Sequence, residues 1–108
     1  METKENLKER LKHQVMERMD ISRTMEDEEI YQLYWKRSEQ AITATHEKYG
    51  GWCQGIAYRI LNAREESEEC VSDTYFTVWN RIPPQKPRIF RAWLGKITRN
   101  LALDRYRY

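Results

Sequence analysis

The sequence predicts an all-α protein, a small bundle of about four helices in one domain. The chain has 108 residues, of which 40% are hydrophobic and 33% are charged, enough apolar material for one modest core. Only four glycines and three prolines are present, so few tight turns are available. Apolar residues recur three and four apart along most of the chain, whereas the alternation typical of strands is hard to find.

Residues 1–27 are predicted to be an N-terminal extension with a narrow apolar stripe. The stripe has one member every four residues, among many charges: Leu7, Leu11, Val15 and Met19. A helix of this kind is marginal in water without a packing partner. Residues 20–27 are expected to form a connector, in which Thr24 or Asp27 caps the next helix. We therefore expect residues 28–108 to form the domain, and the extension to be dispensable for its fold.

The first two helices of the domain are predicted from apolar spacing. The first begins with Ile30, Leu33 and Tyr34 and is expected to end or bend near residues 36–39. The second carries a longer series at helical spacing: Ile42, Thr45, Tyr49, Trp52, Cys53, Ile56, Ile60 and Leu61. The pair Gly50-Gly51 interrupts this series, and each glycine costs about 1 kcal/mol relative to alanine inside a helix. The pair predicts a kink or the close approach of another helix.

The last two helices have clearer ends. Asn62 followed by Glu65 resembles a capping box and predicts a helix start, and Pro83-Pro84 predicts the end of the same helix. Its buried positions are expected to be Cys70, Val71, Thr74, Tyr75, Val78, Trp79 and Ile82. A short basic loop follows, and the final helix is expected to begin near Arg88. Its predicted core positions are Phe90, Trp93, Leu94, Ile97 and Leu101.

Several classes of protein are disfavoured by the residues. The first ten residues are charged and have no apolar centre, and no apolar run approaches membrane-spanning length, so we expect a cytoplasmic protein without membrane contact. Cys53 and Cys70 are expected to be reduced and buried. His13 and His46 have no partners at metal-ligand spacing, and no catalytic or nucleotide-binding motif is present. We predict no enzyme, no metal and no cofactor.

Charge is unevenly distributed, and its acidic part lies on one predicted helix. Residues 62–85 carry a net charge of −3, with five carboxylates and no basic residue between Glu65 and Asp73. Helical spacing places four polar residues on one side of this helix: Glu65, Glu69, Ser72 and Asp73. An ordinary solvated face and a docking face for a basic partner both fit this pattern, and the residues alone leave the two open.

The basic part of the chain is its end. Residues 86–108 carry a net charge of +6, and Lys96, Arg99 and Asn100 are predicted to point away from the apolar stripe of the last helix. Basic groups bind phosphates, aromatic rings such as Tyr106 and Tyr108 stack on unpaired bases, and asparagine can read a base edge. The candidate nucleic-acid-binding residues are Lys86, Arg88, Arg91, Lys96, Arg99, Asn100, Arg105, Tyr106 and Arg107. The alternative is a solvated basic face.

The segments "AYRIL", "EECVSDTYFTVWNRI" and "FRAWLGKITRNLALDRYR" together resemble region 2 of bacterial RNA polymerase sigma factors, most closely the extracytoplasmic-function (ECF) type of the sigma-70 superfamily. The resemblance covers roughly residues 28–108. It implies a domain that docks on core RNA polymerase and recognises and melts the minus-10 promoter element. The family's second helical domain, which reads the minus-35 element, is not in this chain, so we expect a fragment.

The resemblance also implies roles for individual residues. Glu69, Ser72 and Asp73 match the acidic surface that docks on the clamp helices of the polymerase β′ subunit, and Glu65 is grouped with them. Lys96, Arg99 and Asn100 match the helix that engages the minus-10 element as it melts, and residues 83–89 match the loop that captures a flipped base of the non-template strand. Trp93 matches a core residue.

Two residues depart from the family pattern. Gly95 stands where an aromatic residue is common, which removes a stacking surface, and Ser72 stands where glutamine is common, which alters the polymerase contact. An anti-sigma factor is a candidate third partner, although no residue identifies one. The competing interpretation is a standalone helical interaction or regulatory module that does not bind promoters.

Overall fold

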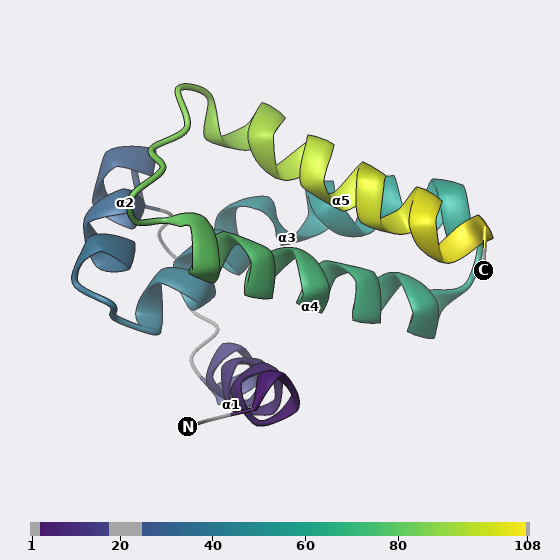
Figure 1. Ribbon diagram of the computed structural model, residues 1–108, viewed down its shortest axis with the longest axis horizontal. Helices are drawn as coiled ribbons and strands as arrows, with labels where there is room; N and C mark the ends of the chain where they lie inside the picture. The colour runs from purple at the N-terminus through teal and green to yellow at the C-terminus, as the bar shows by residue number, and fades with distance from the viewer. Residues whose placement is uncertain (1–2, 18–24, 108) are drawn as a thin grey trace.

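The computed structural model describes residues 3–17 and 25–107, with the backbone alone for residues 11–17. In this part of the chain the protein is all-helical, as predicted. Its helices are α1 (Lys4–Glu17), α2 (Asp27–Trp35), α3 (Gln40–Leu61), α4 (Arg64–Arg81) and α5 (Phe90–Arg107). α3 is the central helix against which the other four pack, and α4 and α5 run side by side in opposite directions (Figure 1). Over the same residues, no helix combines the length and apolarity needed to cross a membrane.

α3, α4 and α5 meet along small buried side chains. These are Cys53 and Ala57 on α3, Ser67, Cys70 and Thr74 on α4, and Thr98 and Ala102 on α5. The hydroxyl oxygens of Thr74 and Thr98 share a hydrogen bond of 3.0 Å, and the Cys70 thiol donates to the Thr98 carbonyl with Sγ and O 3.6 Å apart. Short side chains let helix axes approach closely, and their polar atoms find partners within the core. Both cysteines are free and buried, as predicted.

Gly95 is buried where α5 crosses α3. A Cβ atom at this position would lie 3.2 Å from Nε1 of Trp52 and 3.3 Å from Cδ1 of Ile56. Such contacts are already tight for one carbon, so an aromatic ring would not fit without moving the helices apart. Glycine at this position therefore serves the packing of α3 on α5.

The structure around the pair Gly50-Gly51 differs from the prediction. α3 continues without interruption through Gly50 and Gly51. A Cβ atom at Gly50 would lie 2.7 Å from Nδ1 of His46, one turn earlier in the same helix, and a Cβ at Gly51 would have no neighbour within 4 Å. The atoms nearest to a Cβ at Gly50 belong to a side chain of α3 itself, and α3 shows no break at this pair.

Two predictions about helix ends are wrong: how α4 starts, and which residue caps α2. Asn62 does not start α4 by a capping box; it ends α3 in the left-handed conformation, at φ 50° and ψ 36°, and Ala63 precedes α4. Asparagine tolerates this conformation well, so Asn62 and Ala63 are enough to connect the two helices. α2 is capped by a capping box between Glu26 and Glu29 rather than by Asp27, and Thr24 lies outside the described residues. α4 ends at Arg81, just before the two prolines, as predicted.

The turn between α2 and α3 is tied to the end of α4. α2 ends at Trp35, within the predicted region, and Arg37 takes a left-handed φ of 57°. Its guanidinium lies 3.8 Å from the centre of the Trp79 ring and donates to the carbonyls of Trp79 (2.9 Å) and Ile82 (2.8 Å). A cation that satisfies the last carbonyls of a helix stabilises that end.

Phe90, the first residue of α5, is the centre of an aromatic cluster. Its ring meets the rings of Tyr31, Tyr34 and Tyr49 nearly edge-on, at centroid distances of 5.0, 6.4 and 5.6 Å. The Tyr31 hydroxyl also donates to the carbonyl of Pro87 at 2.8 Å. Edge-to-face pairs stabilise a core beyond the apolar area that they bury. The cluster fixes where α5 starts after the loop, and therefore which of its sides faces solvent.

α1 lies against α3 and α4 at the edge of the bundle. Of its predicted stripe, Leu7 packs against the core, while the side chains of the other three members lie outside the described part of the chain. Arg10 pairs with Glu39 at 2.7 Å. The predicted boundary after residue 27 falls one residue inside α2, whose cap is Glu26.

We expect a chain that starts at Met25 to keep the fold of α2–α5, because it retains the α2 cap and the shared core. The described contacts that this chain loses are those of the half-buried Leu7 and of the Lys8 and Arg10 ion pairs, and their loss should lower the free energy of unfolding by about 1–2 kcal/mol. Thermal melting followed by circular dichroism tests this. A broad, non-cooperative transition would show instead that α1 is part of the core.

His46 should make stability pH-dependent. Burial lowers its pKa below the ordinary value of 6.5, an effect that the nearby Glu47 only partly opposes, and its ring shares a 2.9 Å hydrogen bond with the Tyr75 hydroxyl. Because the folded-state pKa is below the unfolded-state pKa, the contribution to stability is complete above about pH 6.5 and declines as the pH falls. Between about pH 7 and pH 5 the wild type should lose up to about 1 kcal/mol more than His46→Gln. Urea titrations at the two pH values measure the free energy of unfolding of both proteins. Equal losses for the wild type and His46→Gln would contradict this.

Candidate functional site

The acidic face of α4 is defined by Glu65, Glu69, Ser72 and Asp73. These residues lie on one side of the helix and are exposed or half-exposed, while Val71, Tyr75 and Val78 are buried on the other side, as predicted. Successive turns place Glu65, Glu69 and Asp73 in a row along the helix. The core therefore holds three carboxylates at the surface in one line.

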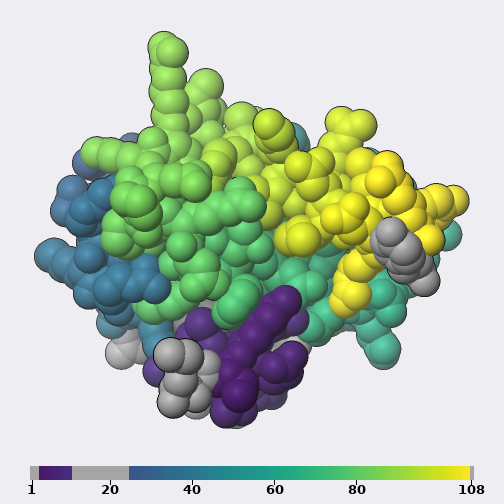
Figure 2. All heavy atoms as spheres, in the orientation of Figure 1, coloured from purple at the N-terminus to yellow at the C-terminus, as the bar shows by residue number. Residues whose placement is uncertain are grey.

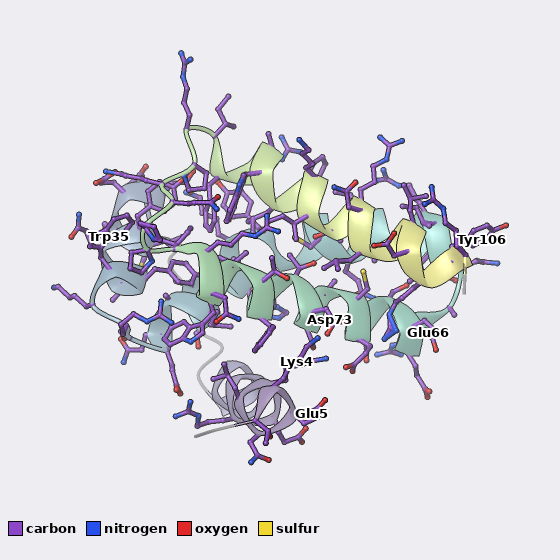
Figure 3. The ribbon with its side chains drawn as sticks, in the orientation of Figure 1. Lys4, Glu5, Trp35, Glu66, Asp73 and Tyr106 are labelled. Carbon is purple, nitrogen blue, oxygen red and sulfur yellow. The ribbon has the colours of Figure 1, made fainter. Side chains whose placement is uncertain are left out.

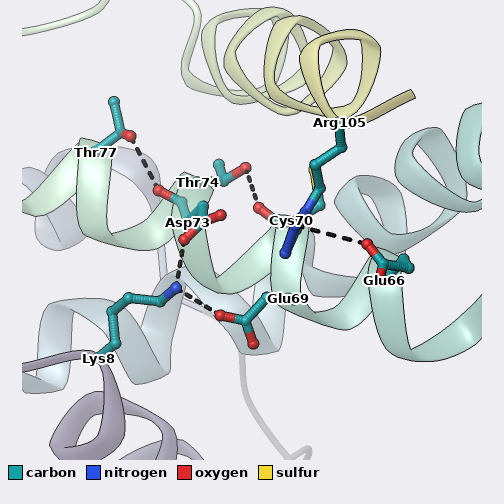
Figure 4. Close-up of polar contacts among 8 residues, drawn as sticks. All are labelled: Lys8, Glu66, Glu69, Cys70, Asp73, Thr74, Thr77 and Arg105. Atoms are coloured by element: carbon teal, nitrogen blue, oxygen red, sulfur yellow. Dashed lines mark hydrogen bonds and ion pairs between the residues drawn. The ribbon is translucent and has the colours of Figure 1, made fainter. Parts of the chain in front are cut away.

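The acidic face has basic neighbours that its own segment of sequence lacks. The ammonium of Lys8 on α1 lies between Glu69 (2.6 Å) and Asp73, to both of which it donates hydrogen bonds (Figure 4). Figure 3 shows Lys4 on the side of α1 that faces α4, and its ammonium lies 5.2 Å from the centre of the Phe76 ring. Sequence reasoning missed Lys8, because about sixty residues separate it from its partners and only packing brings them together.

The basic face of α5 is defined by Lys96, Arg99, Asn100, Tyr106 and Arg107. All five side chains are exposed, and the Tyr106 side chain is 72% accessible. The predicted core positions of α5 are buried or packed against the core, including Trp93, which is half-buried. The division of α5 into an apolar side and a basic side is thus as the spacing predicted. Tyr108 lies outside the described residues.

Arg105 is separated from this face. Its side chain is 30% exposed and reaches from α5 to α4, where Nη1 lies 3.6 Å from Oε2 of Glu66 (Figure 4). Its Nε atom is buried without a hydrogen-bond partner among the described residues. A sequence signal exists for this orientation: Arg105 follows the buried Thr98 by seven residues, two turns further along the same side of the helix.

The remaining basic candidates lie on the loop before α5 and at its start. Lys86 is exposed and pairs with Glu28 at 2.9 Å, a hydrogen bond that lowers the pKa of the Glu28 carboxyl, and Arg88 is exposed. The Arg91 guanidinium lies 3.9 Å from the centre of the Trp52 ring, whose Nε1 donates to the Arg91 carbonyl at 3.2 Å. Trp52, on α3, was not predicted as a site residue; it extends the cationic and aromatic surface of α5 onto a second helix.

The site consists of two charged surfaces on neighbouring helices. Among the residues with described side chains, no group of three His, Cys, Asp or Glu residues lies together as metal ligands would. The described histidine, His46, is engaged with Tyr75. What the site offers is a row of carboxylates on one helix and a row of cations with aromatic rings on its neighbour.

Comparisons with known proteins identify the family of this chain. A family model described as Sigma-70 region 2 matches residues 45–108. "ECF RNA polymerase sigma factor SigE" of Mycolicibacterium smegmatis (strain ATCC 700084 / mc(2)155) is 33% identical over 52 residues, a match that covers 48% of this chain and 20% of that protein. No solved structure matches significantly.

The family match covers more than half of the chain and includes α4, α5 and most of α3. The chain spans only about a fifth of the length of the curated relative. The Sigma-70 region 2 family is not a family of enzymes. The match therefore confirms the prediction that the chain is not an enzyme. By this match over more than half of its residues, the chain belongs to the Sigma-70 region 2 family.

Proposed function

We propose that this domain acts in transcription initiation as the part of an ECF-type sigma factor that binds core RNA polymerase and the minus-10 promoter element. The observation that carries the proposal is the placement of two surfaces of opposite charge on neighbouring helices of one core, in a Sigma-70 region 2 domain. An acidic face and a basic face suit two different partners at the same time. Partners of this kind imply a cytoplasmic protein.

In this proposal the acidic face of α4 docks on the clamp helices of the polymerase β′ subunit. Glu65 is exposed and makes no ion pair among the described residues, so it is available to a basic partner. Glu69 and Asp73 continue the row, and Ser72 lies beside them with a hydroxyl in place of a longer amide side chain. Complementary charge of this kind steers association and sets orientation more than it adds affinity.

The basic face of α5 then contacts the non-template strand of the melted minus-10 element. Lys96, Arg99 and Arg107 are free of ion pairs with described residues and can neutralise phosphates. Asn100 can donate to and accept from a base edge, and Tyr106 offers a ring for stacking. Lys86, Arg88 and Arg91 would extend this path along the loop, with Trp52 beneath Arg91. Arg105 we assign to the contact between α5 and α4.

Reversing one charge of the acidic face should weaken polymerase binding. We expect Asp73→Lys to raise the Kd for core RNA polymerase about tenfold or more, because a cation then faces the basic partner. Asp104→Lys, the same charge change at an exposed residue of α5, is the matched control and should have little effect on binding without DNA. Fluorescence anisotropy with labelled protein measures both. Equal affinities of wild type and Asp73→Lys would contradict docking through α4.

The basic face should prefer single-stranded promoter DNA, at modest affinity for the isolated domain. Asn100→Ala should remove about 1–3 kcal/mol of preference for a minus-10-like strand over a scrambled strand. Arg99→Ala should weaken binding to both strands and reduce the salt dependence by about one phosphate contact. Controls that remove the same groups elsewhere are Asn6→Ala on α1 and Arg64→Ala on α4, both exposed.

Anisotropy with labelled oligonucleotides, with and without core polymerase, measures this preference. Tighter binding to duplex than to single strand would contradict the proposed role in melting. Absence of binding to any DNA at low salt, even with polymerase, would favour a helical interaction module that does not contact promoters.

A further inference from the structure

α1 lies on the same face of α4 that we propose for polymerase docking. In Figure 2 the atoms of α1 (purple) lie directly against those of α4 (green). The Lys8 side chain, only 13% exposed, reaches Glu69 and Asp73 together, and Lys4 lies over the Phe76 ring further along α4. Three successive turns of α4 are therefore engaged by one helix from the other end of the chain.

The contact places a cation where the proposed partner would place one. Glu69 and Asp73 are two of the three carboxylates in the row, and each forms an ion pair with the same ammonium. Burial lowers the pKa of Lys8, but the hydrogen bonds to Asp73 and Glu69 more than offset this, so the pKa is raised above its ordinary value and the side chain stays charged near neutral pH. A clamp helix that pairs with these carboxylates must share them with Lys8 or displace it, and displacement frees both oxygens that Lys8 holds.

The contact is also of a kind that can be broken. Apart from Leu7, the described α1 side chains that touch the bundle do so through charged groups at partly exposed positions. Lys8 is mostly buried, but the carboxylates that it pairs with keep 37% and 23% of their side-chain surface exposed, so another cation can reach them and take its place. The aromatic cluster and the small-residue core of α3, α4 and α5 include none of the α1 side chains that the structure describes, those of residues 4–10. As far as these residues are concerned, α1 can leave α4 without disrupting the packing of α2–α5.

We propose that α1 is an intramolecular cover for the acidic face, which core polymerase must displace in order to bind. This inference rests on the proposed function, because it names the regulation of the same site. A face that is open in only a fraction of molecules binds with an affinity reduced by that fraction. α1 thus sets a threshold for polymerase binding, and anything that releases or removes α1 lowers the threshold.

The test uses the full chain with Lys8→Glu, which repels both carboxylates, and Lys8→Gln, which removes the charge without adding another. Lys36→Glu makes the same reversal at an exposed residue beyond the end of α2 and is the matched control. Hydrogen exchange of the α1 amides, followed by mass spectrometry, reports release of α1 without reference to polymerase. Anisotropy reports the Kd for core polymerase.

We expect both Lys8 variants to exchange their α1 amides faster than wild type and to bind core polymerase about three- to tenfold more tightly, the size that two partly exposed ion pairs support. Lys36→Glu should match the wild type in both measurements. Faster exchange without tighter binding, while Asp73→Lys still weakens binding, would overturn the cover and leave polymerase docking intact. If neither Asp73→Lys nor the Lys8 variants change the Kd, the proposed docking face is wrong and the cover falls with it.

Discussion

The close contact of α3, α4 and α5 along small side chains is the constraint on which the rest of the structure depends. Cys53, Cys70, Thr98 and Ala102 leave room for three helices to approach one another, and Gly95 removes the last obstacle where α5 crosses α3. Closely packed helices have few alternative rotations, because turning one of them would drive a larger side chain into its neighbour. The orientation of α4 and α5 is therefore fixed, and with it the direction of every surface charge that they carry.

Because the helices are fixed in this way, arginines at different positions have different roles. Arg37 satisfies the last carbonyls of α4, Arg105 bridges α5 to Glu66, and Arg99 extends into solvent. The three arginines differ in where the core points them and not in their chemistry. A guanidinium that contacts acceptors within the protein ties two elements together, whereas one that remains in solvent is available to a phosphate. On the acidic face, Asp73 is paired with Lys8, whereas Glu65 is exposed.

Much of the fold could be predicted because helices are encoded locally. The apolar spacing of α4 and α5 predicted their buried sides, and the proline pair predicted where α4 ends. Predictions from local patterns failed where the same residues fit two different local structures. Asn62 followed by Glu65 fits a capping box, yet asparagine equally suits the left-handed end of a preceding helix, which is where it lies. Gly50 suggested a neighbouring helix, but its neighbour is a side chain of α3.

By itself the sequence determined the helical class, the sides of α4 and α5 that meet the core, and the opposite charges of the two remaining sides. These are properties of spacing within about two turns of helix. Only the tertiary structure decided which charges find partners. Lys8 reaches Glu69 and Asp73, and Arg91 reaches Trp52, across tens of residues of chain. Such pairs depend on the rotation and crossing of whole helices, which packing alone selects.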